Sequence, residues 1–527
     1  MTTMAATSAF SARVSAIRDE SHDASAARLR TWSHVALILL ATVAAVLRLI
    51  HLGEPSLTHA EAWRANWSYT ADSDQIRRLP PLQFVMLWTL QHLFAAGEFG
   101  LRMPSACAGI LCVCLLFRFA QREWGLIAAL IAGLFAAVHP VLLEQSRVLK
   151  VFSIEALFTV ILLTTGLRAC RDGTRRAYLI FLASALLGLG FTFSASFLAA
   201  AWIPLLARSQ WRKSPAPASP PSMGTQHSRS TRGTLVVVAA ALAAAAIACY
   251  IWFSGAACRG EVADYYFGTV EPVWPPSYAA QPLVAWLLSS TVGAVKYTLG
   301  AAHLPLPHRW IFTTVCALAV AAAIPNLWRH HRPLLLAIAG MLLIAMLAGT
   351  LRLYPFGEIR TMTHAVPAVV LIVGFGLAVL VQSLKRSPAT ALLLAFCVGI
   401  PTAYAVPAAL RTPPPNEHIR PVFDYVDTHR ADNNALFIYY PVDEAYAYYR
   451  RGDQTPALVQ PRTDRGDTAA FAQRFDDWIA THRRVWFIFA HPWSDERELW
   501  LEHLQVHYEL ADHFAIGDAS AHLFVTR

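Results

Sequence analysis

The run VALILLATVAAVLRL, from Val35 to Leu49, and the stretch PSLTHAEAW, from Pro55 to Trp63, decide what kind of fold this chain adopts. The first run is predominantly apolar, follows a polar segment that carries arginines, and lacks the cleavage pattern of a signal peptide, so we expect it to remain as a membrane helix. The second stretch begins where the chain leaves the bilayer and contains a single carboxylate, Glu61. A carboxylate there is solvated at little cost and can reach a lipid headgroup. Glu61 is therefore a candidate catalytic base, with a solvated loop acid as the alternative.

The composition of the whole chain extends this interpretation. Of its 527 residues, 56% are apolar and only 15% are charged, and the mean hydropathy is +0.41, whereas a soluble domain carries about a quarter charged residues. The chain is therefore predicted to be an integral membrane protein. Its net charge of +9 comes from short basic clusters between apolar spans, which is typical of positive-inside topology, so no nucleic acid partner is expected. The spacing of the eight cysteines offers no metal site, and no cofactor is expected.

The basic clusters also predict how the chain is organised across the bilayer. We expect a mainly α-helical, polytopic membrane bundle of about eleven to thirteen spans, each of about 20 residues, followed by a small α/β domain. The predicted segments are a cytoplasmic tail 1–30, a transmembrane module 31–410 and an extracytoplasmic α/β domain 411–527. Within the module, the charge rule predicts an external loop 51–80, a cytoplasmic linker 208–232 and an external loop 254–309. Residues 81–118 hold two apolar stretches where the rule requires an odd number of crossings, so either one stretch is re-entrant or the turn at Arg118 is external.

The character of the sequence changes after Pro413-Pro-Pro415. Amphipathic and alternating patterns then predict short helices and strands that are typical of a soluble α/β domain. In order, they are a helix over 417–430, a strand over 435–440, a helix over 467–482, a strand over 485–490, a helix over 495–504 and a strand over 521–525.

Three predicted external loops bring polar residues to one face of the membrane. Glu61 lies in the first, His139 and Lys150 frame the second, and Tyr354 and Arg360 lie in the third. One acid among several cations suits a lipid phosphate substrate, because a phosphate needs charge-assisted donors and an acceptor hydroxyl needs a base. For each cation taken singly, interfacial snorkelling is the simpler interpretation, so the hypothesis depends on the convergence of the loops.

Four motifs occur in order along residues 31–410. They are Pro55-Ser-Leu with Glu61-Ala-Trp63, Leu79-Pro-Pro-Leu82 with Glu98-Phe-Gly-Leu-Arg102, His139-Pro140 with Lys150-Val-Phe152, and Tyr354-Pro-Phe-Gly357 with Arg360. Together they resemble the polyprenyl-phosphate-sugar-dependent glycosyltransferases of the GT-C superfamily, in the branch related to protein O-mannosyltransferases and the lipid A aminoarabinose transferase. Lys150 and Phe152 stand where that family has arginine and tyrosine. The first loop of the family usually carries Asp-Glu, and here these positions are Ala60 and Glu61.

The resemblance implies transfer of a hexosyl or pentosyl group from a polyprenyl-phosphate sugar to an acceptor on the outer face of the inner membrane. It implies that Glu61 is the base that deprotonates the acceptor hydroxyl. The other implied site residues bind the donor: Lys150, Arg102 and Arg360 neutralise the leaving phosphate, Tyr354 and His139 donate to sugar or phosphate oxygens, and His59 is a polar neighbour of Glu61. For Tyr354 and His139, aromatic-belt packing and helix termination are alternatives. No metal is implied, because the leaving group is a lipid phosphate rather than a nucleotide diphosphate.

The implied partners are the polyprenyl-linked donor, the lipid bilayer and an acceptor that is a glycan, a lipid or a protein. Two other classes of function remain open. A catalytically degenerate membrane scaffold would keep the fold, and Ala60 in place of the usual acid favours it. A lipid or sugar transporter would need charged or broken helices near the bilayer midplane and related halves, whereas the ionisable residues here cluster at the ends of spans.

Overall fold

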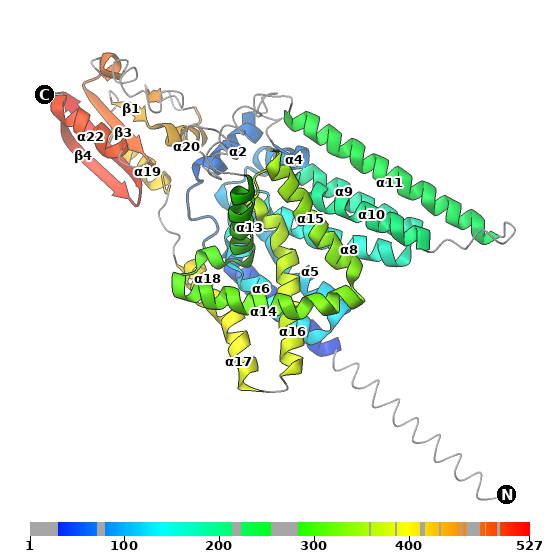
Figure 1. Ribbon diagram of the computed structural model, residues 1–527. Helices are drawn as coiled ribbons and strands as arrows, with labels where there is room; N and C mark the ends of the chain where they lie inside the picture. The colour runs from blue at the N-terminus through cyan, green and yellow to red at the C-terminus, as the bar shows by residue number, and fades with distance from the viewer. Residues whose placement is uncertain are drawn as a thin grey trace, which may run out of the picture.

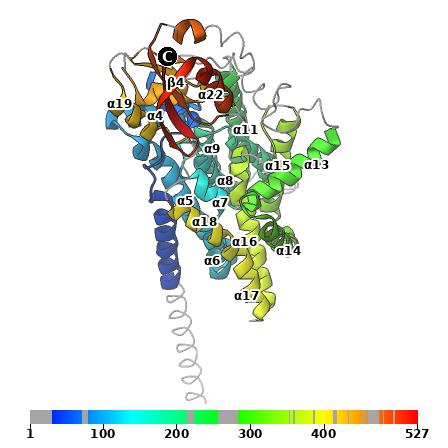
Figure 2. The same ribbon diagram turned by 90° about the vertical axis from the view of Figure 1, so that its left-hand side faces the viewer.

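The computed structural model describes residues 30–70, 79–212, 223–254, 283–411 and 417–526, apart from short gaps at 352, 358–359 and 385–386 and several between 432 and 495. Within these ranges the chain forms a helical bundle and, after residue 417, a small domain built on a β-sheet (Figure 1). The start of the helix Arg30–Leu49 and the small domain lie at opposite ends of the bundle (Figure 2).

The bundle is built from helices whose composition suits a membrane interior. Seven of the described helices are long and apolar enough to cross a membrane, and three shorter apolar helices accompany them. The seven are Arg30–Leu49, α5 (Glu98–Trp124), α8 (Phe152–Asp172), α14 (Leu306–His330), α15 (Arg332–Thr350), the segment formed by η2 (Arg360–Ala365) and α16 (Val366–Ser383), and the segment formed by α17 (Pro388–Leu394), η3 (Ala395–Gly399) and α18 (Ile400–Leu410). The other helices between residues 126 and 303 are α6 (Leu126–Val138), α7 (Pro140–Gln145), α9 (Arg175–Phe191), α10 (Ala195–Arg212), α11 (Met223–Ser254), α13 (Leu283–Leu299) and the short turn η1 (Ala301–His303). The prediction of a mainly α-helical, multi-pass membrane protein is confirmed, and the total of about eleven to thirteen crossings stays a prediction.

The ambiguous region 81–118 contains one short helix near the small domain and one helix that runs through the bundle. The short helix, α4 (Pro81–Phe94), packs against α2 (His59–Thr70), where the Gln91 side chain donates to the carbonyl of Ala65 at 3.0 Å. The next helix, α5, begins at Glu98, which pairs with Arg420 of the small domain at 2.6 Å. Both ends of α4 therefore lie on the side of the small domain, so we infer that α5 alone carries the chain across in this region.

The far end of α5 meets two turns that carry basic clusters, residues 168–176 and 329–332, which the charge rule places in the cytoplasm. Glu123 pairs with Arg171 of α8 at 2.6 Å and lies 3.5 Å from the ring of His331, between α14 and α15. The turn after Arg171 is shaped by Gly173, whose φ of 66° favours glycine, and by Thr174, whose hydroxyl accepts from the first turn of α9. Turns that the charge rule places together in the cytoplasm are thus neighbours in space. Which side of the membrane they face stays a prediction.

Two predicted loop regions contain helices instead. α13 lies inside the predicted external loop 254–309, and its 17 residues include a single charged residue, Lys296. The sequence analysis missed it because no basic cluster marks a turn beside it. α10 and α11 extend into the predicted linker 208–232 from both sides, so of that linker only residues 213–222 lie outside the described part of the chain. Residues 71–78 and 255–282 of the two predicted external loops also lie outside it.

The small domain has a mixed five-stranded sheet with the order β2-β1-β3-β5-β4. Its strands are β1 (Ala435–Ile438), β2 (Ala457–Val459), β3 (Arg484–Phe489), β4 (Tyr508–Ile516) and β5 (Ala519–Thr526), and its helices include α19 (Arg420–His429), η4 (Tyr440–Val442), α20 (Asp443–Tyr449) and α22 (Glu496–His507). β1 pairs in parallel with β2 and β3, whereas β5 runs antiparallel to β3 and β4. Strands β1, β3 and β5 and helices α19 and α22 lie where the sequence patterns place them, and β2, β4 and α20 were not predicted. The helix predicted over 467–482 lies largely outside the described residues.

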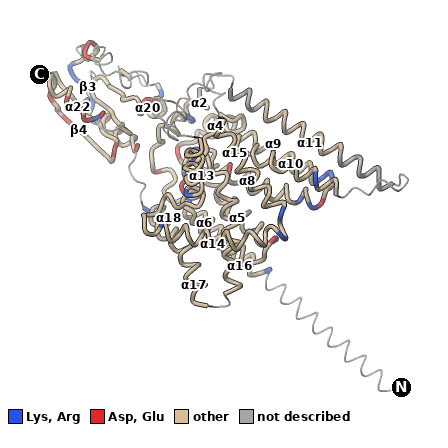
Figure 3. The backbone as a smooth tube through the Cα atoms, in the orientation of Figure 1, with Lys and Arg blue, Asp and Glu red and all other residues tan. Residues whose placement is uncertain are grey.

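The small domain and the N-terminal part of the bundle share one hydrophobic core. Leu57, Ala65 and Leu87 are buried in the same cluster as Phe437 and Phe487 of the sheet. Charged residues are sparse within the bundle and gather around α2, at helix ends and in the small domain (Figure 3). The junction between α2 and the small domain therefore combines charged side chains with a shared hydrophobic core.

Candidate active site

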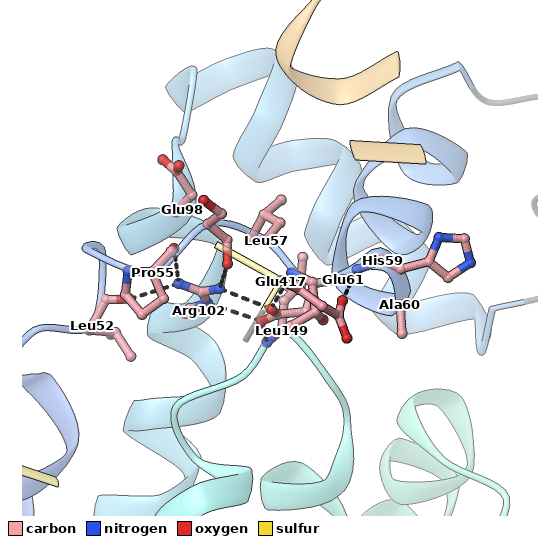
Figure 4. A network of polar contacts seen from close by, with 12 residues as sticks. Leu52, Pro55, Leu57, His59, Ala60, Glu61, Glu98, Arg102, Leu149 and Glu417 are labelled. Carbon is pink, nitrogen blue, oxygen red and sulfur yellow. Dashed lines mark hydrogen bonds and ion pairs between the residues drawn. The ribbon is translucent and has the colours of Figure 1, made fainter. Parts of the chain in front are cut away.

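Glu61 lies in the first turn of α2, and its side chain is fully buried. Oε1 accepts from Arg102 Nε at 3.0 Å and from the backbone N–H of Leu149 at 2.6 Å. Oε2 accepts from Arg102 at 2.9 Å and from the backbone N–H of Thr58 at 3.0 Å. Figure 4 shows these contacts converging on one carboxylate. Glu61 thus joins the first loop, α5 and the segment that leads to Lys150.

Arg102 uses all its donors at the same place. Besides both oxygens of Glu61, its guanidinium donates to the carbonyls of Leu52 at 3.1 Å, Pro55 at 2.8 Å and Ser56 at 2.9 Å. A guanidinium has five N–H groups, and these contacts account for five hydrogen bonds. Arg102 therefore holds the loop before α2 in a fixed conformation.

These contacts change the chemistry expected of Glu61 and Arg102. Burial alone would raise the pKa of Glu61, but the charge and hydrogen bonds of Arg102 and the two backbone N–H groups lower it to about 2. A carboxylate with so low a pKa, and with its acceptor positions already used, is poorly suited to take a proton at neutral pH. The geometry thus favours neither Glu61 as the base nor Arg102 as a phosphate ligand. It favours a buried ion pair that positions the loops around it.

Three cations lie near one another beside this ion pair. The Lys150 side chain is only 9% exposed, and no ion pair to its amine occurs in the part of the chain that the structure describes. Burial and, to a smaller extent, the charges of Arg360 and Arg64 lower the pKa of Lys150 to about 7, while Glu61 and Glu417 act in the opposite direction. The structure therefore brings Lys150 and Arg360 together as predicted, and it adds Arg64 from α2. An excess of positive charge in a partly buried site favours an anionic ligand.

His139 and Tyr354 hold main-chain segments instead of facing this cluster. The His139 ring lies 3.2 Å from the carbonyl of Thr298, at the end of α13, and burial lowers its pKa to about 3. Tyr354 donates to the carbonyl of Thr361 at 2.8 Å and so closes the loop that carries Arg360. The place of His139 directly after α6 fits the alternative of helix termination, whereas the closure of a loop by Tyr354 was not among the alternatives that the sequence left open.

The small domain supplies carboxylates at the start of α2, which the sequence analysis missed. The ring Nδ1 of His59 lies 3.5 Å from Oδ1 of Asp443 in α20, and the backbone N–H of His59 donates to Glu417 at 2.6 Å. Arg64 stands one helical turn after Glu61, a spacing that the sequence does show. Glu417 gave no such signal, because 358 residues separate it from His59.

Long apolar helices, a site formed by loops at one end of the bundle and a C-terminal α/β domain together define a class of multi-pass membrane protein. The fold is that of the GT-C glycosyltransferases. It is similar to the crystal structure of ArnT from Cupriavidus metallidurans in the apo state, with a TM-score of 0.54 and 13% identity over 92% of this chain and 97% of that chain. It is also similar to the structure of that ArnT bound to undecaprenyl phosphate, with a TM-score of 0.52 and 14% identity over the same shares of the two chains.

Sequence comparison gives a more local relationship. The family profile described as dolichyl-phosphate-mannose-protein mannosyltransferase matches residues 78–218. A search of the curated proteins found no match to the chain. The matched region includes Arg102, His139 and Lys150, so it covers part of the candidate site and leaves Glu61 and Arg360 outside.

Proposed function

We propose that this chain is a membrane glycosyltransferase that takes a sugar from a polyprenyl-phosphate carrier and transfers it to an acceptor on the outer face of the inner membrane. The observation that carries the proposal is the group of Lys150, Arg360 and Arg64 beside a buried carboxylate–guanidinium pair. The ArnT structure with undecaprenyl phosphate bound and the mannosyltransferase profile support a carrier of this kind.

The cations have a defined task in such a reaction. When the bond between the sugar and the carrier phosphate breaks, negative charge grows on the phosphate oxygens. Lys150, Arg360 and Arg64 would stabilise that charge more strongly than in water, because the site is partly buried. Their mutual repulsion before the donor binds, which adds to burial in lowering the pKa of Lys150, would be relieved by the phosphate.

The ion pair of Glu61 and Arg102 would act as a positioning device. Glu61 binds the backbone N–H of Leu149, the residue next to Lys150, and Arg102 binds three carbonyls of the first loop. Misplacement of a catalytic group by about 1 Å can cost about a hundredfold in rate, so a fixed Lys150 matters. Tyr354 would play the same part for Arg360 through its bond to the Thr361 carbonyl.

The choice of sugar and acceptor is left to experiment. Hexosyl and pentosyl groups both fit the proposal, and so do glycan, lipid and protein acceptors. The proposed topology places the N-terminus in the cytoplasm and the small domain outside, so that the site faces the outer leaflet.

Transfer assays with charge variants of Lys150 would test the proposal. Radiolabelled undecaprenyl-phosphate sugars, covering mannosyl, glucosyl, galactosyl and aminoarabinosyl groups, would be supplied to membranes that contain the full chain and native envelope acceptors. Lys150→Arg should keep part of the activity and Lys150→Met should lose about a hundredfold or more, because only a cation can meet the leaving phosphate. Lys296→Met, on α13, is the matched control and should transfer like the wild type.

The outcomes separate the three classes of function. Label moved from the carrier to an envelope acceptor indicates a transferase. Label that crosses the bilayer while still on its carrier would indicate a transporter. A wild-type chain that binds undecaprenyl phosphate and transfers no sugar from the panel would indicate a scaffold and overturn the proposal.

A further inference from the structure

Glu417 is the first described residue of the small domain, and it reaches the start of α2. Its Oε2 accepts from the backbone N–H of His59 at 2.6 Å, and Figure 4 places it beside Glu61 and Ala60. Its backbone has a φ of +56°, a conformation that is uncommon for a residue with a side chain. The Asp518 carboxylate accepts a hydrogen bond from the backbone N–H of Glu417 at 2.7 Å, and the His491 ring lies 3.4 Å from Oε1 of Glu417. Contacts with the domain and with α2 thus fix this carboxylate at the junction.

The charge of Glu417 reaches the proposed phosphate site. It is close enough to Lys150 to raise the pKa of that amine. The Glu417 side chain is 20% exposed, whereas Glu61 is buried and already accepts four hydrogen bonds. Of Glu61 and Glu417, it is Glu417 that is open to a further partner.

We propose that Glu417, supplied by the C-terminal domain, is the base of the transfer reaction; this inference rests on the proposed function. The acceptor oxygen forms a bond to the anomeric carbon of the sugar while the bond from that carbon to the carrier phosphate oxygen breaks. The electron pair of the broken bond leaves with the phosphate, which the cations of the site neutralise. The proton of the acceptor hydroxyl goes to the Glu417 carboxylate. Ala60, which has no ionisable group, is thereby compensated from the other end of the chain.

The test separates a base from a structural contact. Glu417→Gln keeps an oxygen that can accept from His59, so α2 keeps its contact, but the variant cannot take a proton. It should lower kcat by about a hundredfold. Its affinity for undecaprenyl phosphate should be equal to or higher than that of the wild type, because a negative charge near Lys150 is removed. Glu417→Asp should recover part of the rate, and formate should partly rescue Glu417→Ala. Asp476→Asn is the matched control, because this carboxylate of the same domain lies 3.3 Å from the ring of His503 and has no place in the proposed site.

Each result decides the inference. A wild-type rate for Glu417→Gln, in a preparation where Lys150→Met has lost transfer, would overturn the role of Glu417 and leave the proposed function intact. Equal losses of transfer and of undecaprenyl phosphate binding in Glu417→Gln, with no rescue of Glu417→Ala by formate, would show a structural role and overturn the inference as well. No transfer by the wild type from any carrier in the panel would overturn the proposed function and this inference together.

Discussion

Replacing Glu61 with glutamine should destabilise the protein strongly, although the side chain keeps its size. The substitution removes the negative charge opposite Arg102, and it turns the NH₂ group of the new amide toward Arg102 or toward the N–H of Leu149, where a donor would face a donor. The Arg102 charge then stays buried without its counterion.

The lowered pKa of Glu61 gives the size of the effect. A fall from 4.5 to about 2 for a fully buried carboxyl corresponds to about 3 kcal/mol in favour of the folded, ionised form. Breaking a buried ion pair by removing one partner typically costs 3–5 kcal/mol, which agrees. Because the folded-state pKa lies below the unfolded one, this stabilisation is fully present above about pH 4.5 and is lost as the pH falls toward 2. We therefore expect Glu61→Gln to lose about 3 kcal/mol at neutral pH and to show a weaker acid dependence than the wild type.

Denaturation of the purified, detergent-solubilised protein, followed by tryptophan fluorescence between about pH 3 and pH 7, would measure both effects. The double variant Glu61→Gln with Arg102→Met should be less destabilised than the sum of the two single variants, because neither charge is then left alone. A Glu61→Gln variant that is as stable as the wild type but has lost sugar transfer would refute this reasoning and return Glu61 to the role of base.

Three further predictions follow from the described contacts. Binding of undecaprenyl phosphate should weaken as the pH rises through about 7, where Lys150 loses its charge, and Lys150→Arg should bind with little change over that range; titration by native mass spectrometry would measure this. In a cysteine-free background, a cysteine at Ser219 should resist a membrane-impermeant reagent in intact cells and one at the exposed position Glu509 should react, and the reverse pattern would invert the proposed topology. Tyr449→Phe should lower the free energy of unfolding by about 1–3 kcal/mol in thermal denaturation, because it removes the hydroxyl that accepts from the N–H of Leu57 at 2.7 Å. An unchanged stability would mean that water replaces the hydroxyl.

Local patterns in the sequence predicted much of the architecture. Apolar runs such as Val35–Leu49 marked helices, because a membrane span needs a continuous apolar surface. Basic clusters located turns such as the one after Arg171, and alternating residues located strands β1, β3 and β5. α13 was missed because its turns carry no basic cluster, and β4 was missed because most of its side chains are exposed or half-buried.

The candidate site was predicted only in part, for a physical reason. Loop convergence brought Lys150 and Arg360 together, since helix ends on one side of a bundle meet. The partners of Glu61 were not predictable from its neighbourhood, because Arg102 is 41 residues away and Leu149 is 88 residues away. Whether a carboxylate is a free base or half of an ion pair depends on such distant contacts, and a single sequence carries no local sign of them.

The shared core between α2 and the small domain has a consequence for how the protein is made. Ser56 contacts the ring of His418, which is 362 residues later in the chain, and Leu57 is buried in one cluster with Phe437. The loop with Ser56 and Leu57 is synthesised long before the domain with His418 and Phe437. Until that domain folds, the loop therefore lacks the apolar side chains against which it packs. On the proposed function, a chain truncated before Glu417 should therefore transfer no sugar. The proposed activity at the N-terminal loop would thus begin only after the C-terminal domain has been synthesised and folded.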